Sequence, residues 1–396
     1  MTDLLRSILE RTTYRKIDVD LLLDHERPSW VRFDPELGYV PADIVMRDGI
    51  DHCWNAYTHE SSGQRKMLHY ADQPCRINTY GDSFTQCQQV SDGETWQEVL
   101  AAHLREPIRN FGSGGYGVYQ AYRRARRIED TDCAAEYIIL NLFVDDHIRS
   151  LDAARWIRTA WNERERPAEQ AYPLHGLPWA HLRFDLARGE WVEKSSLCQD
   201  ENDLRALCDK EKFATTFKDD TIVRLFLLEN GGETDVSEFE ALAEALGITV
   251  DLRNPAGRAQ EAAKLHRHYG FKSTEFLFQE RILPWLAQTG KKLLILLTYC
   301  QGTLTQFLRG EGRYDQEILD FLQSKNLLLV DMAEKHREEY STFRGDVDQY
   351  ISNHYVQAAG AAVFGHYTPK GNHFFAFATK NDLRKQLTPP PPAYRD

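Results

Sequence analysis

Ser83 combines a nucleophilic side chain with a position where a nucleophile could be displayed. It stands in Gly81-Asp82-Ser83, directly after an apolar run that ends at Tyr80. A serine hydroxyl attacks a substrate only when a base removes its proton and hydrogen-bond donors stabilise the oxyanion that forms. The sequence therefore has to supply a histidine and a set of donors to accompany Ser83.

Two further polar segments follow apolar runs. The glycine-rich stretch Asn-Phe-Gly-Ser-Gly-Gly-Tyr-Gly occupies residues 110–117, and Val-Asp-Asp-His occupies residues 144–147. In an open parallel sheet the carboxyl ends of neighbouring strands line one crevice, where ligands bind. We therefore expect these segments and Ser83 to converge on one site.

His366 is the candidate base among the 14 histidines. It lies in Phe-Gly-His-Tyr-Thr-Pro-Lys-Gly, a loop-forming segment just before an apolar helical pattern. His373 is its nearest competitor, but it falls where that helix begins and is expected to pack or cap there.

The elements that must position these residues are predicted from five apolar runs. The runs are continuous rather than alternating, which is typical of parallel strands buried on both faces, and helical patterns lie between them. They cover residues 76–80, 107–111, 136–144, 291–299 and 326–332. The pattern predicts a doubly wound α/β domain.

The strands are interrupted by a long segment of different character. It contains a predicted hairpin with its turn at Arg188-Gly189 and several helices. The predicted organisation is an N-terminal extension packed on the core (1–74), the α/β domain (75–150 and 291–385), a cap-like insertion (151–290) and an extended Pro-rich tail (386–396).

Composition excludes several classes of protein. A formal net charge of −12 is opposite to the basic footprint of nucleic-acid binders. No run of 18 apolar residues is present, which argues against a membrane span, and the N-terminus lacks the apolar segment of a signal peptide. Seven cysteines without CxxC spacing favour reduced thiols and a cytoplasmic location.

The motifs together resemble those of the SGNH/GDSL hydrolase superfamily, of which the chain would be a divergent member. The resemblance is carried by Gly-Asp-Ser-Phe-Thr at 81–85, Asn-Phe-Gly-Ser-Gly-Gly at 110–115 and Gly-His-Tyr-Thr-Pro-Lys-Gly-Asn at 365–372. It covers under half of the chain. It implies a three-layer α/β/α, flavodoxin-like fold and an esterase that works without a metal or other cofactor through an acyl-serine intermediate.

The resemblance also implies roles for individual residues. Ser83 matches the nucleophile, with Asp82 beside it in the motif, and its own N–H is one oxyanion donor. Gly115, in the block that Asn110 begins, supplies the second donor. His366 matches the base that removes the serine proton and later activates water.

Two positions depart from the family pattern. The third family block has an asparagine whose side chain donates to the oxyanion, and this sequence has Asp145 there. The acid three residues before the histidine is replaced by Val363. Asp145 and Asp146 are the candidates for an altered oxyanion position or for an acid that orients His366.

Alternatives remain open at this stage. Asp145, Asp146 and His147 are suitable ligands for a divalent cation. Residues 112–117 satisfy G-x-G-x-x-G, which occurs in dinucleotide-binding proteins. However, the next acids after a strand, Asp145 and Asp146, are farther along the chain than the acid that binds the ribose in such proteins. The same site could transfer acyl groups to alcohols, or bind a ligand without catalysis.

The expected substrate is a small-molecule ester, including O-acetylated carbohydrate. Tryptophans of the insertion could line a carbohydrate-sized pocket, although tryptophans are more often part of the core. They are Trp156, Trp161, Trp179 and Trp191.

Overall fold

The computed structural model describes residues 1–161, 175–357 and 364–392. Its contacts divide the chain into two compact units, each made of two chain segments. The first unit comprises Met1–Val40 and His147–Phe278, and the second comprises Pro41–Asp146 and Gln279–Asp396. The domain boundaries expected at residues 74, 150, 290 and 385 stay predictions.

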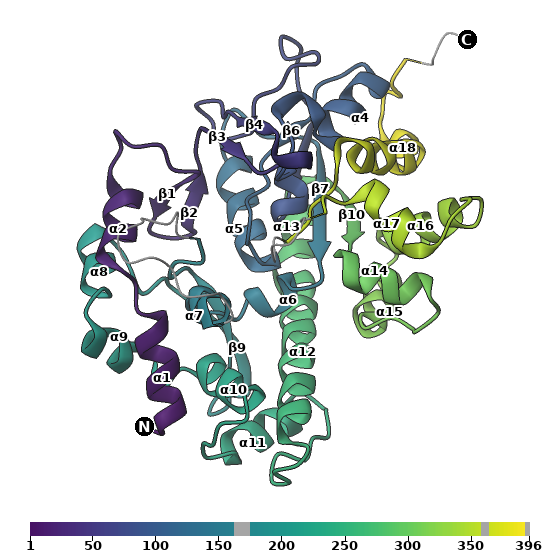
Figure 1. The fold of residues 1–396 in the computed structure, drawn as a ribbon. Coiled ribbons are helices and arrows are strands. Elements are labelled where there is room, and N and C mark those ends of the chain that lie inside the picture. The colour runs from purple at the N-terminus through teal and green to yellow at the C-terminus, as the bar shows by residue number, and fades with distance from the viewer. Residues whose placement is uncertain (162–174, 358–363, 393–396) are drawn as a thin grey trace. The chain divides into compact units, whose positions relative to one another are not determined.

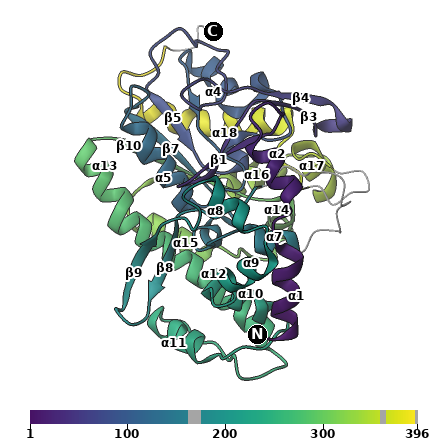
Figure 2. The ribbon, with the colours of Figure 1, turned by 90° about the vertical axis from the view of Figure 1, so that its left-hand side faces the viewer.

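A five-stranded parallel sheet forms the centre of the second unit (Figure 1). Its order is β11-β10-β7-β5-β6, so that, counted along the chain from β6, the strands run 2-1-3-4-5. The strands are β5 (Ile77–Tyr80), β6 (Arg109–Asn110), β7 (Tyr137–Phe143), β10 (Lys292–Thr298) and β11 (Leu328–Asp331). All five predicted strands are confirmed, and β5, β7 and β10 lie beside one another in Figure 2.

The continuous apolar runs are explained by burial on both faces. All seven residues of β7 are buried. Its one polar residue, Asn141, accepts a hydrogen bond at 3.1 Å from Thr298 of β10, which lies on the neighbouring strand. A buried polar group inside a sheet is tolerated when it is paired in this way.

Helices cover both faces of this sheet (Figure 1). On one face, α4 and α18 pack together through Trp96 and Phe375, whose rings are 5.0 Å apart. On the other, α5 and α13 meet through Tyr122 and Trp285, 6.0 Å apart. The second unit is therefore an α/β domain with helical layers on either side of a parallel sheet.

The remaining elements of the second unit connect these layers. A small antiparallel hairpin and two 3₁₀ turns precede or follow β5. The elements are β3 (Ile44–Arg47), η1 (Ile50–His52), β4 (Trp54–Tyr57), α3 (Ser83–Gln86), η2 (Asp92–Glu94), α4 (Trp96–Leu104), α5 (Val118–Glu129), α13 (Leu283–Thr289), α14 (Gln301–Leu308), α15 (Gln316–Ser324), α16 (Met332–Tyr340), α17 (Val347–His354) and α18 (Pro369–Gln386).

The first unit is mainly helical. Leu225, Phe239 and Leu265 belong to one of its buried clusters, which joins α10, α11 and α12. Its elements are α1 (Asp3–Thr12), α2 (Lys16–Leu23), β1 (Val31–Asp34), β2 (Gly38–Pro41), α6 (Asp146–Arg149), α7 (Trp156–Trp161), β8 (His181–Asp185), β9 (Glu190–Lys194), α8 (Glu201–Ala206), α9 (Lys210–Phe217), α10 (Thr221–Glu229), α11 (Ser237–Ala245) and α12 (Arg258–Leu277), which runs into a π-helical turn (Phe278–Ile282).

Two sequence expectations can be checked in this unit. The hairpin predicted around Arg188-Gly189 is confirmed, because β8 and β9 pair antiparallel and Gly189 has a φ of +66°. Trp156 and Trp179 are buried, and Trp179 donates to the Asp152 carbonyl at 2.7 Å. These two tryptophans therefore belong to the core.

None of the helices in the described ranges is long and apolar enough to span a bilayer.

Candidate functional site

Ser83 begins α3 immediately after β5. The turn between them is tight, because Gly81 has a φ of +152° and a Cβ there would lie 2.3 Å from the Thr85 Oγ1. Asp82 caps the helix by accepting from the Phe84 N–H at 2.9 Å. The family-like Gly-Asp-Ser sequence thus has a local structural cause, since it supplies a left-handed glycine, a helix cap and a residue at the first helical position.

The glycine-rich loop after β6 packs against this turn. Ser113 N–H donates to the Gly81 carbonyl at 3.0 Å, and Gly114 N–H donates to the Gln86 Oε1 at 2.8 Å. A Cβ on Gly112 would lie 2.2 Å from the Gln86 nitrogen. The loop therefore needs glycine at 112 in order to approach α3 so closely.

Gly115 differs from its neighbours in this loop. The other amides of residues 111–117 donate to acceptors within the chain, which are the carbonyls of Thr79, Gly81 and Ser113 and the side-chain oxygens of Asn110, Gln86 and Gln120. In the described part of the chain the Gly115 N–H has no acceptor, and its φ is +84°. This amide is therefore available to donate a hydrogen bond to a bound group.

The same observation bears on the G-x-G-x-x-G alternative. A dinucleotide loop binds pyrophosphate through several backbone N–H groups. Here the amides of Gly112, Gly114 and Gly117 are committed to Asn110, Gln86 and Gln120. Asn110 accepts the Gly112 N–H at 2.9 Å, and its predicted supporting role at the site stays a prediction.

The third strand end carries Asp145 and Asp146. Asp145 is half-buried, while Asp146 is buried and accepts from the Phe143 N–H at 3.0 Å. The Phe143 ring stacks on Phe84 with 4.9 Å between centroids, which joins this strand end to α3. His147, on the first unit's side of the boundary, contacts the Thr274 hydroxyl at 2.8 Å. Among the described residues, no group of three or more His, Cys, Asp or Glu side chains could hold a metal ion.

His366 lies beside the turn that carries Ser83, although the two residues are far apart in the sequence. Its ring centroid lies 5.1 Å from that of Phe84, the neighbour of Ser83. Its carbonyl accepts from the Val356 N–H at 2.8 Å, and a Cβ on Gly365 would lie 2.1 Å from the Val356 oxygen. His373 instead lies exposed on α18. The structure therefore brings His366 next to the serine turn.

Gln89 is the residue that sequence reasoning missed. Its Oε1 accepts from the His366 backbone N–H at 2.7 Å and lies 3.1 Å from the His366 Nδ1. No spacing rule connects two residues 277 positions apart. Val363, where the family has its acid, lies outside the described residues, and the roles predicted for Asp145 and Asp146 stay predictions.

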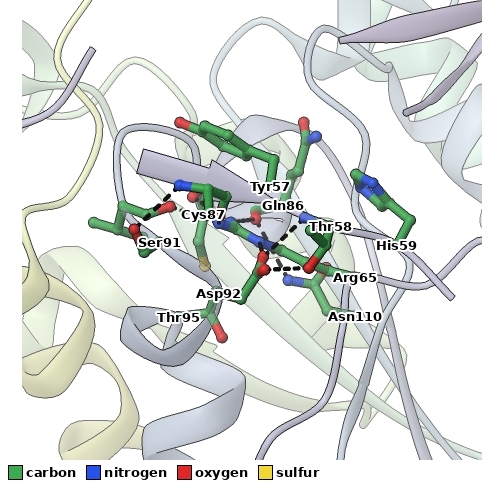
Figure 3. Close-up of polar contacts among 12 residues, drawn as sticks. Tyr57, Thr58, His59, Arg65, Gln86, Cys87, Ser91, Asp92, Thr95 and Asn110 are labelled. Carbon is green, nitrogen blue, oxygen red and sulfur yellow. Dashed lines mark hydrogen bonds and ion pairs between the residues drawn. The ribbon is translucent and has the colours of Figure 1, made fainter. Parts of the chain in front are cut away.

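A buried arginine braces the loop that carries Gln89 (Figure 3). Arg65 donates to the carbonyls of Gln86 and Cys87, each at 2.7 Å, and forms an ion pair with Asp92 at 2.8 Å. It also donates to the Val90 carbonyl. Cys87 and Gln89 both have positive φ, at 59° and 71°, so the guanidinium stabilises an otherwise strained backbone path.

Burial controls the ionisable groups closest to the site. It raises the pKa of the Cys87 thiol to about 12, so this thiol is protonated and inert near neutral pH. Burial, with a smaller contribution from the Asp82 carboxylate, also raises the pKa of Tyr367. Both neighbours therefore remain neutral, and neither is a competing nucleophile.

Neither the family models nor the curated proteins compared with this sequence gave a match.

Proposed function

We propose that this chain is a serine ester hydrolase, a divergent member of the SGNH/GDSL superfamily that acts through an acyl-Ser83 intermediate. The observation that carries the proposal is that three groups from separate parts of the chain lie close together. A serine at the end of β5, an uncommitted glycine amide after β6 and a histidine from residue 366 lie around one turn. These are the nucleophile, oxyanion donor and base that acyl transfer requires.

The position of the site supports the same proposal. From β5 the chain adds β6 on one side of the sheet and then β7, β10 and β11 on the other side, so the strand order changes direction at β5. Ligands of doubly wound sheets bind at such a switch point. This order supports the flavodoxin-like fold that the family resemblance implies. Ser83, Gly115 and Asp145 all follow strands that meet there.

In the proposed reaction His366 takes the Ser83 hydroxyl proton as the serine oxygen attacks the ester carbonyl carbon. The tetrahedral oxyanion then collapses, the bond to the alcohol oxygen breaks, and the imidazolium returns its proton to that oxygen. Water repeats the sequence on the acyl-serine and releases the acid. The chemistry is complete with these side chains, so no cofactor enters the proposal.

The oxyanion would be held by the N–H groups of Ser83 and Gly115. The family's third donor, an asparagine side chain, is replaced by Asp145, and an ionised carboxylate cannot donate a hydrogen bond. One missing donor typically costs about 10²–10³ in rate. We therefore expect slow turnover of simple esters unless the substrate itself supplies a further donor.

The test is hydrolysis of p-nitrophenyl acetate by the full chain. Ser83→Ala and His366→Ala should each abolish the burst of nitrophenol and the turnover while leaving the thermal unfolding temperature close to that of the parent. Ser341→Ala, an exposed serine in the same unit, is the matched control and should retain full activity. Undiminished turnover in either site variant would remove this mechanism.

A fluorophosphonate probe separates the proposal from a binding protein that has lost catalysis. We expect covalent labelling of the parent at Ser83, located by peptide mass spectrometry, and none in Ser83→Ala. Absence of labelling on the folded parent would favour the binding protein. Acyl transfer to an alcohol would appear as a new ester when acceptor alcohols or sugars are added to the reaction.

The substrate class is proposed to be short O-acyl esters, including O-acetylated carbohydrates, as the resemblance implies. A panel of p-nitrophenyl esters of increasing acyl length, followed by acetylated sugars, would test it. Activity that rises with acyl length would argue against an O-acetyl substrate.

A further inference from the structure

Gln89 occupies the position beside His366 where an acid was expected. It is 5% exposed and lies three residues beyond the end of α3, in the loop that Arg65 braces. Among the described residues, its side chain makes hydrogen-bond contacts with the His366 backbone N–H and Nδ1, at 2.7 and 3.1 Å. Both contacts are made by the same atom, the Gln89 Oε1, and both go to one residue.

The geometry determines which nitrogen of the ring carries the proton. A backbone N–H can only donate, so the amide atom of Gln89 that faces the His366 N–H is the carbonyl oxygen. That same oxygen faces Nδ1, and an oxygen acceptor requires a proton there. In the neutral ring Nε2 then carries the lone pair, which is the tautomer that a general base needs.

We propose that Gln89 is a positioning residue for this reaction. It orients the His366 ring and fixes its proton on Nδ1, the task that the family resemblance assigns to the missing aspartate. This inference rests on the proposed function, because the ring's orientation matters for catalysis only if His366 is the base. Unlike a carboxylate, a neutral amide adds no negative charge beside the imidazolium that forms during the reaction.

Gln89 is itself held in place by the surrounding loop. Its backbone N–H donates to the Tyr57 hydroxyl at 2.6 Å, and that hydroxyl donates to the Asp48 carboxylate at 2.6 Å. Arg65 donates to the carbonyl of Val90, the next residue. The glutamine therefore presents its side chain from a fixed backbone, as a positioning group must.

Several ionisable groups lie on the elements packed against the imidazole. They include Asp82, Cys87, Arg65, Tyr355 and Tyr367, together with Asp145 and Asp146 at the end of β7. Burial raises the pKa of the Cys87 thiol and of both tyrosines, so these three groups stay uncharged near neutral pH. A carboxylate introduced at position 89 would thus be a new charge in direct contact with the ring.

The first experiment reads the ring directly and does not depend on activity. In the full chain labelled with ¹⁵N-histidine, the two-bond correlations of His366 report its tautomer, with the His366→Ala spectrum as the assignment. We expect Nδ1–H in the parent, loss of that preference in Gln89→Met, and a higher titration midpoint in Gln89→Glu. An Nε2–H tautomer in the parent would overturn the proposal.

The second experiment measures kcat/KM for p-nitrophenyl acetate against pH. Gln89→Met removes the acceptor and should lower kcat/KM by about tenfold or more, equivalent to about 1.4 kcal/mol. Gln89→Glu should retain activity and move the acid limb of the profile upward by about one pH unit, because a neighbouring carboxylate favours the imidazolium. Gln306→Met, an exposed glutamine of α14, should change neither value.

The outcomes separate the two proposals. An unmoved acid limb in Gln89→Glu, with full activity in Gln89→Met, would show that the glutamine is only structural. If the tautomer and its loss are observed but Ser83→Ala still hydrolyses the ester, the pairing of Gln89 with His366 stands and the hydrolase mechanism fails. A thermal unfolding temperature for each variant verifies that the chain is folded.

Discussion

The two sides of the candidate site are built differently. The serine loop, residues 81–92, is held by the buried Arg65 guanidinium, which contacts three of the loop's backbone carbonyls and one of its carboxylates. The histidine segment, residues 364–368, is held by backbone hydrogen bonds to residues 354 and 356 and by the neutral side chain of Gln89. One side depends on a buried charge, and the other depends on close packing and uncharged contacts.

This difference has consequences for what mutations will do. Breaking a buried ion pair leaves an uncompensated charge and acts on the stability of the whole domain. Displacing a short neutral segment instead acts on the position of one side chain. We therefore expect changes on the serine side to appear mainly in the free energy of unfolding and changes on the histidine side mainly in the rate.

The largest expected effect is that of Arg65→Met. The substitution keeps the aliphatic volume but leaves Asp92 without its cation and the carbonyls of Gln86, Cys87 and Val90 without a donor. The free energy of unfolding in urea should fall by about 3–5 kcal/mol.

Arg309→Met is the control for this prediction. Arg309 pairs at 2.9 Å with Asp348, but both side chains are largely exposed, so its loss should cost about 1 kcal/mol or less. Equal losses in the two variants would contradict the distinction between the buried brace and a surface pair.

Two glycines extend the comparison to both sides. A Cβ at Gly112 would lie 2.2 Å from the Gln86 nitrogen, and a Cβ at Gly365 would lie 2.1 Å from the Val356 oxygen. Gly112→Ala should lower the free energy of unfolding by about 1–3 kcal/mol, as overpacking does, because it pushes on the braced turn. Gly365→Ala should lower kcat/KM at least as much as Gly112→Ala does. It should lower the free energy of unfolding less than Gly112→Ala, because the histidine segment can shift to relieve the clash.

Urea denaturation and ester hydrolysis on the same samples check both halves of this prediction. Gly302→Ala is the matched control, because a Cβ at Gly302 on α14 would meet nothing within 4 Å. It should be neutral or stabilising by up to about 1 kcal/mol through helix propensity. A larger stability loss in Gly365→Ala than in Gly112→Ala would reverse the comparison.

The same contrast explains what the sequence could predict. The five strands follow from continuous apolar runs, and the turn at Gly81 to Ser83 follows from local chemistry, so both were accessible. The Gly115 amide could be placed only through the family pattern. Gln89 could not be predicted, because a long-range contact of a common polar residue leaves no periodicity or spacing in the sequence.

Arg65 was missed for a related reason. In the sequence it is one of many charged residues between two predicted elements, and nothing local distinguishes a buried arginine from a solvated one. Its role arises from the backbone path of residues 86–90, which turns carbonyls inward. Such a path depends on tertiary packing and cannot be derived from residue types alone.

Acid should destabilise the second unit through a buried imidazole on α16, next to the histidine segment. His336 is fully buried and contacts the hydroxyls of Tyr350 and Tyr367 at 2.9 and 3.4 Å. Burial, with a smaller contribution from His354, lowers the pKa of His336 well below 6.5. The native state keeps this ring neutral while the unfolded chain binds a proton below pH 6.5, so acid favours unfolding.

The free energy of unfolding should therefore fall below about pH 6.5, with His336 contributing a slope of up to about 1.4 kcal/mol per pH unit. In His336→Gln that contribution disappears and the slope between pH 6.5 and 5 becomes shallower. His373→Gln, which changes an exposed histidine, should keep the parent slope. Parallel pH profiles for the parent and His336→Gln would refute this assignment.

The smallest expected effect concerns Gln301, which donates to the Val356 carbonyl at 3.1 Å beside the histidine segment. Gln301→Ala removes this neutral hydrogen bond, worth about 0.5–1.5 kcal/mol, and a longer one that the exposed Gln357 side chain donates to the Gln301 Oε1 at 3.4 Å. The Val356 N–H also donates to the His366 carbonyl, so losing this support of Val356 should displace His366 slightly. We therefore expect kcat/KM to decrease a few-fold. In the double variant Gly365→Ala/Gln301→Ala, the loss of kcat/KM caused by Gln301→Ala should be smaller than in the parent. Removing the Gln301 side chain there also removes one of the two groups that the new Cβ at position 365 would meet. Additive losses in the double variant would mean that the histidine segment is as firmly held as the serine loop.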